Sequence, residues 1–125
     1  NCAGHRLSTG SIEEILTQHK DVAECAVVGL NDELKGQVPI GLIVLNTSSM
    51  NSEETIVKET INLVREKLGP VASYKKSIIV ENLPKTRSGK ILRSTISKIL
   101  NKEDYKVPAT IEDIKTLELI KCLKI

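Results

Sequence analysis

The sequence predicts an α+β fold, a small sandwich in which a three-stranded sheet lies against flanking helices. Three aliphatic runs, at residues 22–30, 37–45 and 76–80, have the length and composition of strands. Segments with apolar residues at helical spacing precede, separate and follow these runs. The expected order is therefore helix, two strands, helix, strand, loop and helix.

Two helices carry end signals. Ser11 as an N-cap, with Glu14 reaching back to it, fits a capping box and predicts a short helix that ends near His19. Ser52 opens the longest helix, which the glycine-proline pair at 69–70 ends. The apolar face of this long helix is formed by Ile56, Val57, Ile61, Val64 and Leu68.

The other elements are shorter. Pro39 has no N–H to donate, so it belongs near a strand start or at a sheet edge. A helix is expected over about residues 91–100, and the segment after Pro108 predicts one or two further helical turns. We expect residues 1–108 to form one domain and residues 109–125 to be a tail whose structure the sequence does not determine.

Composition fits one soluble globular domain of 125 residues, of which 40% are hydrophobic and 27% charged. The core must be aliphatic, because the chain has no Trp, no Phe and only two Tyr. The net charge of +2 is too small to indicate a class of binding partner. No apolar run approaches the roughly 18 residues of a membrane span, and we expect no membrane partner. The start at Asn1, without an initiator Met, predicts a domain excised from a longer protein.

The cysteines do not form a recognisable site. Cys2, Cys25 and Cys122 are too few and too scattered for a disulfide framework or a CxxC metal site. Cys25 lies in an apolar run and is expected to be a small buried hydrophobe.

The loop around Lys90 is the strongest functional signal. It lies between the third strand and the last long helix, where Pro84 fixes one dihedral angle and Ser88-Gly89 supplies a turn. Lys90 is left at the tip, and a cation on a short loop suits work on a phosphate or carboxylate oxygen.

The loop has features of two other kinds of binding site. A P-loop is rejected, since Pro84 replaces the first glycine and Ile91 replaces the Ser or Thr after the lysine. A stripe of six cations without an acid, from Lys85 to Lys102, could follow a nucleic-acid backbone. With only Tyr74 and Tyr105 available for stacking, we expect no nucleic-acid partner.

Two motifs together carry a family resemblance. Residues 4–10 (GHRLSTG), followed by Ile12-Glu13-Glu14, and residues 84–90 (PKTRSGK) resemble the C-terminal domain of the AMP-forming acyl-CoA synthetases, within the adenylate-forming enzymes. The likeness runs from Ala3 to about Asp113. Details near residues 34–37, 69–70 and 86–87 are similar to the short-chain branch, the acetyl- and propionyl-CoA synthetases.

The resemblance implies an acid–thiol ligase with two half-reactions. A short carboxylic acid, propionate or acetate, attacks ATP to give acyl-AMP and pyrophosphate, and the thiol of CoA then displaces AMP. ATP with Mg²⁺ and CoA would be co-substrates, with no tightly bound cofactor. The small domain would turn between the steps against its partner, the large N-terminal domain of the same polypeptide, and would be inactive alone. The likeness to mitochondrial members favours the matrix over the cytosol and a place in fatty-acid metabolism.

Residue roles follow from the same resemblance. Lys90 matches the catalytic lysine of adenylation and would also contact ATP or AMP. Arg6, in the N-terminal loop, matches an arginine that contacts the nucleotide phosphate. Ala3 and Gly4 match the loop that lines the pantetheine tunnel, and Arg65 matches the arginine for the CoA 3′-phosphate. From the residues alone, the preferred interpretation of Arg65 is a cation favoured by a helix C-terminus.

A structural cation is also implied by the resemblance. In the short-chain branch, the turn after the first helix can hold a cation through backbone carbonyls and a histidine, for which Thr17, His19 and Val22 would be the ligands. From the residues alone, His19 is a capping or surface residue at a helix end.

Two alternatives to the synthetase remain. The first is a stand-alone domain that uses the basic loop to bind an anion or a nucleic acid. The second is an adenylation domain that loads a carrier protein; Arg65 favours CoA, because a carrier's phosphopantetheine has no 3′-phosphoadenosine.

Overall fold

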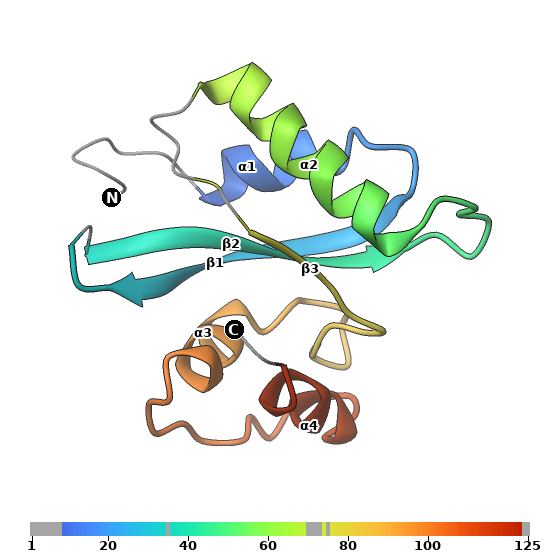
Figure 1. The fold of residues 1–125 in the computed structure, drawn as a ribbon. Helices are drawn as coiled ribbons and strands as arrows, with labels where there is room; N and C mark the ends of the chain where they lie inside the picture. Colours follow the sequence, from blue (N-terminus) through green and yellow to red (C-terminus); the bar gives the residue numbers. More distant parts are fainter. Residues whose placement is uncertain (1–8, 35, 70–73, 75, 124–125) are drawn as a thin grey trace.

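A computed structural model of the chain describes residues 9–34, 36–69, 74 and 76–123. Within these residues, four helices lie against one three-stranded sheet, and the predicted α+β sandwich is confirmed (Figure 1). The elements are α1 (Thr9–Leu16), β1 (Val22–Asp32), β2 (Gly36–Leu45), α2 (Glu53–Leu68), β3 (Ser77–Ile79), α3 (Arg93–Leu100) and α4 (Lys115–Lys121).

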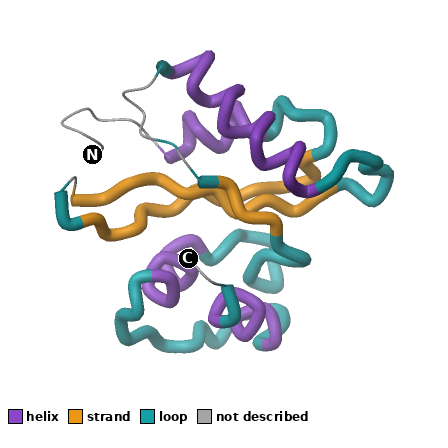
Figure 2. Tube along the Cα trace, in the orientation of Figure 1, coloured by secondary structure: helices purple, strands orange, loops and turns teal. Residues whose placement is uncertain are grey.

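The sheet is mixed. Its strand order is β1-β2-β3, with β1 and β2 antiparallel from Val22↔Leu45 to Asp32↔Gly36. β3 runs parallel to β2 and pairs with only three of its residues, Gly41–Ile43. Parallel neighbours cannot be joined by a tight turn, and α2 provides the crossover between β2 and β3 (Figure 2).

Both faces of the sheet are buried. α1 and α2 cover one face, and α3 and α4 cover the other (Figure 1). Along β1, Cys25 and Val27 belong to the cluster under α1 and α2, whereas Ala26 and Val28 belong to the opposite cluster. Burial on both faces explains why the strands appear in the sequence as continuous apolar runs rather than alternating ones.

The prediction for the start of the first helix was wrong. α1 begins at Thr9, so Ser11 lies inside the helix and cannot have the extended geometry of an N-cap. The end signals of α2 are confirmed, since the Ser52 hydroxyl accepts a hydrogen bond from the Thr55 N–H at 3.2 Å. Gly69, with φ of 81°, donates its N–H to the Arg65 carbonyl at 2.8 Å.

The remaining boundaries follow from pairing. α3 begins at Arg93 rather than at about Ile91, because Ile91 pairs with Lys85 and is therefore extended. Pro39 lies near the start of β2, outside the residues that pair with β3. The helical turns expected after residue 108 are confirmed by α4.

Candidate functional site

The loop that carries Lys90 is a closed hairpin. Lys85 and Ile91 form an antiparallel bridge at its base. The Thr86 N–H donates to the Lys90 carbonyl at 2.8 Å, and the Gly89 N–H donates back to the Thr86 carbonyl at 2.9 Å. Gly89 has φ of 92°, a conformation that glycine adopts without steric cost. The sequence Thr-Arg-Ser-Gly-Lys therefore forms a defined turn.

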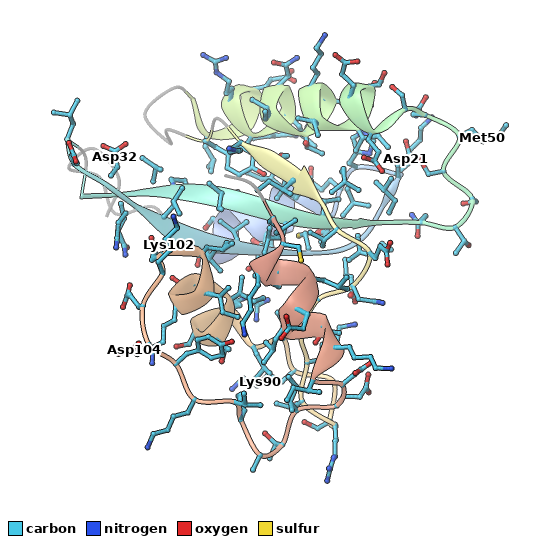
Figure 3. All side chains as sticks on the ribbon, turned by 60° about the horizontal axis from the view of Figure 1, so that its bottom comes forward. Asp21, Asp32, Met50, Lys90, Lys102 and Asp104 are labelled. Atoms are coloured by element: carbon cyan, nitrogen blue, oxygen red, sulfur yellow. The ribbon has the colours of Figure 1, made fainter. Side chains whose placement is uncertain are left out.

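Side-chain hydrogen bonds tighten this turn. The Thr86 hydroxyl oxygen accepts from the Lys90 N–H at 3.1 Å and lies 2.9 Å from the Ser88 hydroxyl. Thr86 thus holds the backbone of Lys90 through both its main chain and its side chain. Lys90 itself is exposed, on the side of the sheet that carries α3 and α4 (Figure 3). Among the described residues, none forms a hydrogen bond or ion pair with its ammonium group, which is free to meet a ligand.

Both ends of the hairpin are fixed to the domain. At the start, the Lys85 ammonium pairs with the Glu24 carboxylate of β1 at 2.7 Å. At the end, Arg93 forms two hydrogen bonds with the Glu13 carboxylate of α1, at 2.7 and 2.6 Å. This pairing raises the pKa of the Arg93 guanidinium. Sequence reasoning missed Glu13, Glu24 and Arg93 as partners, because nothing local in the chain links them.

Arg65 lies on the other face of the domain. It is an exposed residue of the last turn of α2, where its carbonyl accepts the capping N–H of Gly69. Because α2 and the Lys90 hairpin lie on opposite faces of the sheet, Arg65 and Lys90 cannot serve one pocket of this domain (Figure 1). Arg6, Ala3 and Gly4, the other predicted ligand contacts, lie outside the described residues.

His19 lies in the turn between α1 and β1, near the carboxylates of Asp21 and Glu59. Its Nε2 is 2.7 Å from Glu59 Oε1 of α2, and its Nδ1 accepts the Asp21 N–H at 3.1 Å. Side-chain ligand atoms of His19, Asp21 and Glu59 all lie within 4.8 Å of one another. Imidazole with carboxylates is a donor set that suits a divalent cation.

The predicted cation ligands Thr17 and Val22 flank this histidine. The Thr17 hydroxyl donates to the Glu14 carbonyl at 2.8 Å, and the Val22 N–H donates to the His19 carbonyl at 3.1 Å. Sequence reasoning missed Asp21 and Glu59; Asp21 is visible as the next-but-one residue, whereas Glu59 is 40 residues away.

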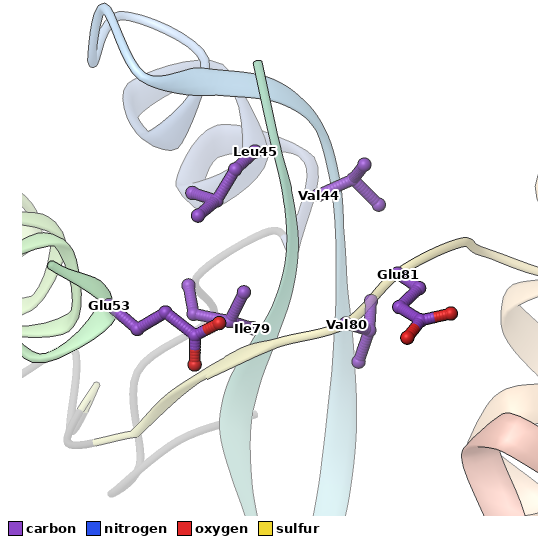
Figure 4. Close-up of a pocket in the computed structure, with 6 residues that line it drawn as sticks. All are labelled: Val44, Leu45, Glu53, Ile79, Val80 and Glu81. Atoms are coloured by element: carbon purple, nitrogen blue, oxygen red, sulfur yellow. The ribbon is translucent and has the colours of Figure 1, made fainter. Parts of the chain in front are cut away.

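Two other features lack the properties of a reactive site. Burial raises the pKa of the Cys25 thiol to about 12, and the nearby Glu13 charge adds to this effect, so the thiol stays protonated and unreactive. A pocket at the end of β2 and β3 holds none of the predicted residues (Figure 4). It is lined by Val44, Leu45, Glu53, Ile79, Val80 and Glu81.

Within the described part of the chain, no helix is long and apolar enough to cross a membrane.

Comparisons with known proteins identify the family. Residues 11–90 match the family described as AMP-binding enzyme C-terminal domain. The chain is 56% identical over 120 residues to acyl-CoA synthetase short-chain family member B, mitochondrial, of Dictyostelium discoideum, a match that covers 96% of the chain and 17% of that protein. It is 52% identical over 113 residues to the mouse acyl-CoA synthetase short-chain family member 3, mitochondrial, covering 90% of the chain and 17% of the relative.

A solved structure agrees with this assignment. The crystal structure of a Brucella canis acyl-CoA synthetase superimposes with a TM-score of 0.73 and 29% identity, over 81% of this chain and 18% of that one. The chain therefore spans less than a fifth of the length of these relatives. Because the match to residues 11–90 covers more than half of the chain, from α1 to Lys90 of the hairpin, the chain belongs to the C-terminal domain family of AMP-binding enzymes.

Proposed function

We propose that this chain is the C-terminal domain of a short-chain, AMP-forming acyl-CoA synthetase and turns against a large N-terminal domain between two half-reactions. The first joins a short carboxylic acid to ATP and releases pyrophosphate, and the second transfers the acyl group from AMP to the CoA thiol. The similarity to relatives named as short-chain acyl-CoA synthetases supports the reaction class. Propionate or acetate is the proposed acid.

One observation carries the two-step proposal. Lys90 and Arg65, the two described cations proposed to meet substrates, lie on opposite faces of one sheet. A domain that shows one face at a time to a fixed active site would use Lys90 in one step and Arg65 in the other. An arrangement for binding a single anion would instead bring such cations to the same face.

The proposed role of Lys90 is electrostatic. As ATP and the carboxylate react, negative charge moves between the carboxylate and the α-phosphate oxygens. An ammonium group held by a rigid turn stabilises that charge without reorganising in the transition state. ATP would enter with Mg²⁺. Arg6, in the N-terminal loop, is proposed to contact the nucleotide phosphate.

The opposite face would serve CoA. Arg65 is proposed to bind the 3′-phosphate of CoA, because a guanidinium pairs with a phosphate through two parallel hydrogen bonds. Ala3 and Gly4 are proposed to line the path of the pantetheine arm. The proposed acyl acceptor is therefore CoA, which has a 3′-phosphate, rather than a carrier protein.

We further propose a structural cation at the turn of His19, held with Thr17 and Val22 as its ligands. The carboxylates of Asp21 and Glu59 beside His19 support a divalent ion there. The names of the relatives support a mitochondrial location. Residues 1–108 are proposed as the lid domain, and residues 109–125 as a C-terminal tail that packs against it through α4.

Replacing Lys90 by Ala in the full-length synthetase tests the proposal. Pyrophosphate exchange, which reports adenylation, should fall by about 10²–10³, since one preorganised donor is lost. Thioester formation from supplied acyl-adenylate should be nearly unchanged, and Lys98→Ala, another exposed cation on the same face, should affect neither step. An equal loss in both half-reactions would contradict the proposal.

A further inference from the structure

The segment after Pro108 pairs with the lysine hairpin. Ile111 forms an antiparallel bridge with Thr86. Two backbone hydrogen bonds flank this bridge: the Arg87 N–H donates to the Thr110 carbonyl at 2.9 Å, and the Glu112 N–H donates to the Lys85 carbonyl at 2.8 Å. Residues 110–112, which we term the brace, thus lie alongside one strand of the hairpin.

The hairpin strand is consequently paired on both sides. Lys85 pairs with Ile91 within the hairpin, and Thr86 pairs with Ile111 of the brace. The result is a miniature sheet of three short segments, with residues 85–87 in the middle. Since a two-stranded hairpin is only marginally stable in water, the third segment should decide how firmly the turn at residues 88–90 is held.

The brace is itself fixed to the core. A turn leads into it, in which the Ile111 N–H donates to the Pro108 carbonyl at 3.1 Å. Asp113 then begins the helical tail, where its carboxylate accepts the Lys115 N–H at 3.0 Å. α4 buries Leu117 and Ile120, each only 1% exposed, on the face of the sheet that also carries α3. A brace anchored by two core side chains can resist movement of the hairpin.

We propose that residues 110–112 are a positioning element for Lys90, which fixes the direction of its side chain for adenylation. The proposal rests on the proposed role of Lys90. The lysine is exposed and its ammonium has no partner among the described residues, so its aim depends on the backbone that carries it. In catalysis, a misplacement of about 1 Å can cost on the order of 10²-fold in rate.

The decisive variant removes one hydrogen bond and keeps the segment. Glu112→Pro deletes the N–H that donates to Lys85. Proline also requires an extended residue before it, which the bridged Ile111 provides. Glu112→Ala loses the same exposed side chain and keeps the N–H, so the ratio between these two variants isolates the hydrogen bond. Ile114→Pro controls for proline itself, because Ile114 is exposed and its φ of −63° suits the ring.

Both half-reactions are measured in the full-length synthetase. We expect pyrophosphate exchange to be about five- to tenfold slower in Glu112→Pro than in Glu112→Ala, in line with the loss of one neutral hydrogen bond. Thioester formation from acyl-adenylate should be equal in the two. Amide hydrogen exchange at Thr86 and Lys90 should be faster in Glu112→Pro only. In a Lys90→Ala background the proline should cause no further loss of exchange activity, because there is no ammonium left to position.

The outcomes separate the two proposals. If Lys90→Ala loses adenylation selectively but Glu112→Pro and Glu112→Ala behave alike, the brace proposal is wrong and the role of Lys90 stands. The brace is also ruled out if Glu112→Pro slows both half-reactions equally, or if it slows adenylation further in the Lys90→Ala background, because either result indicates general damage. If Lys90→Ala itself fails to separate the half-reactions, the proposed function is overturned.

Discussion

Glu13 and Arg93, which are 80 residues apart in the chain, form an ion pair around the open edge of the sheet. Arg93 donates from Nε and Nη2, at 2.7 and 2.6 Å, and the same carboxylate accepts the Val27 N–H of β1 at 2.8 Å. β1 is an edge strand, and unpaired N–H groups on an edge invite pairing with other chains. Glu13 therefore accepts one of the free N–H groups of this edge strand. It also links α1, on one face of the sheet, to α3, on the other.

Glu13→Ala should destabilise the domain by about 1.5–3 kcal/mol, the range for hydrogen bonds to a charged group. The loss leaves the Val27 N–H without its acceptor and Arg93 without its partner. Denaturant unfolding measures the change. Glu14→Ala, at the neighbouring exposed position, should stay within about 0.5 kcal/mol of the parent. Equal midpoints for the two variants would show that the pair adds nothing to stability.

A second side chain closes the same edge. Asn101, at the C-cap of α3, accepts the Asn31 N–H at 2.7 Å and donates to the Gly29 carbonyl at 3.0 Å. Its amide thus pairs with β1 much as a neighbouring strand would. None of these contacts could be predicted from the sequence, because the partners are about 70 residues apart and no local pattern marks them.

The fold was easier to predict from the sequence than the contacts at the edge of its sheet. Continuous aliphatic runs predicted the strands because both faces of the sheet are covered, and the ends of α2 followed from Ser52 and Gly69. The prediction of Ser11 as an N-cap was wrong because the sequence pattern of a capping box can also occur within a helix, as it does in α1. Lys90 was predicted from its loop, but the brace at residues 110–112 was not, because backbone pairing leaves no mark on side-chain composition.

Alkaline solution should weaken the fold through Cys25. Burial raises the pKa of this thiol from 9.0 to about 12, so above pH 9 the unfolded chain loses the proton that the folded chain keeps. The contribution is fully present below pH 9 and is lost as the pH rises toward 12, with a slope of about 1.4 kcal/mol per pH unit. Urea unfolding across this interval measures the slope.

The matched variants are Cys25→Ala and Cys122→Ala. The first removes the buried thiol, so its free energy of unfolding should fall less steeply above pH 9 than that of the parent. The second removes an exposed thiol and should keep the parent's slope. Parallel pH profiles for all three proteins would exclude Cys25 as the source of the alkaline loss.

Gly41 is required by a buried tyrosine. Tyr74 is 1% exposed, and its hydroxyl lies 2.6 Å from the Ser77 hydroxyl beneath α2. A Cβ at Gly41 would collide with the Tyr74 hydroxyl and would also crowd Leu16. We expect Gly41→Ala to cost about 1–3 kcal/mol in unfolding free energy, as overpacking does.

The collision can be tested by removing the hydroxyl. Tyr74→Phe deletes the atom that the new Cβ would meet, so Gly41→Ala should cost less in a Tyr74→Phe background than in the parent. A double-mutant cycle measures this difference. Strictly additive effects would place the cost of Gly41→Ala elsewhere, at Leu16 or in the strand backbone.

Arg65→Ala in the full-length synthetase should weaken CoA binding and leave adenylation alone. The exposed guanidinium of Arg65 is in the last turn of α2, on the face away from Lys90. Losing a charge-assisted contact with a phosphate costs roughly 1.5–3 kcal/mol, which is about ten- to a hundredfold in apparent affinity. The Michaelis constant for CoA should rise accordingly, while those for ATP and the carboxylic acid stay the same.

Dephospho-CoA, which lacks the 3′-phosphate, gives the sharper comparison. The parent enzyme should prefer CoA, whereas Arg65→Ala should scarcely distinguish the two, because the guanidinium proposed to recognise the phosphate is gone. Lys67→Ala removes the other cation from the last turn of α2 and should keep the parent's preference. If Arg65→Ala also keeps that preference, Arg65 does not bind the 3′-phosphate and serves only as a favourable charge at the C-terminus of α2.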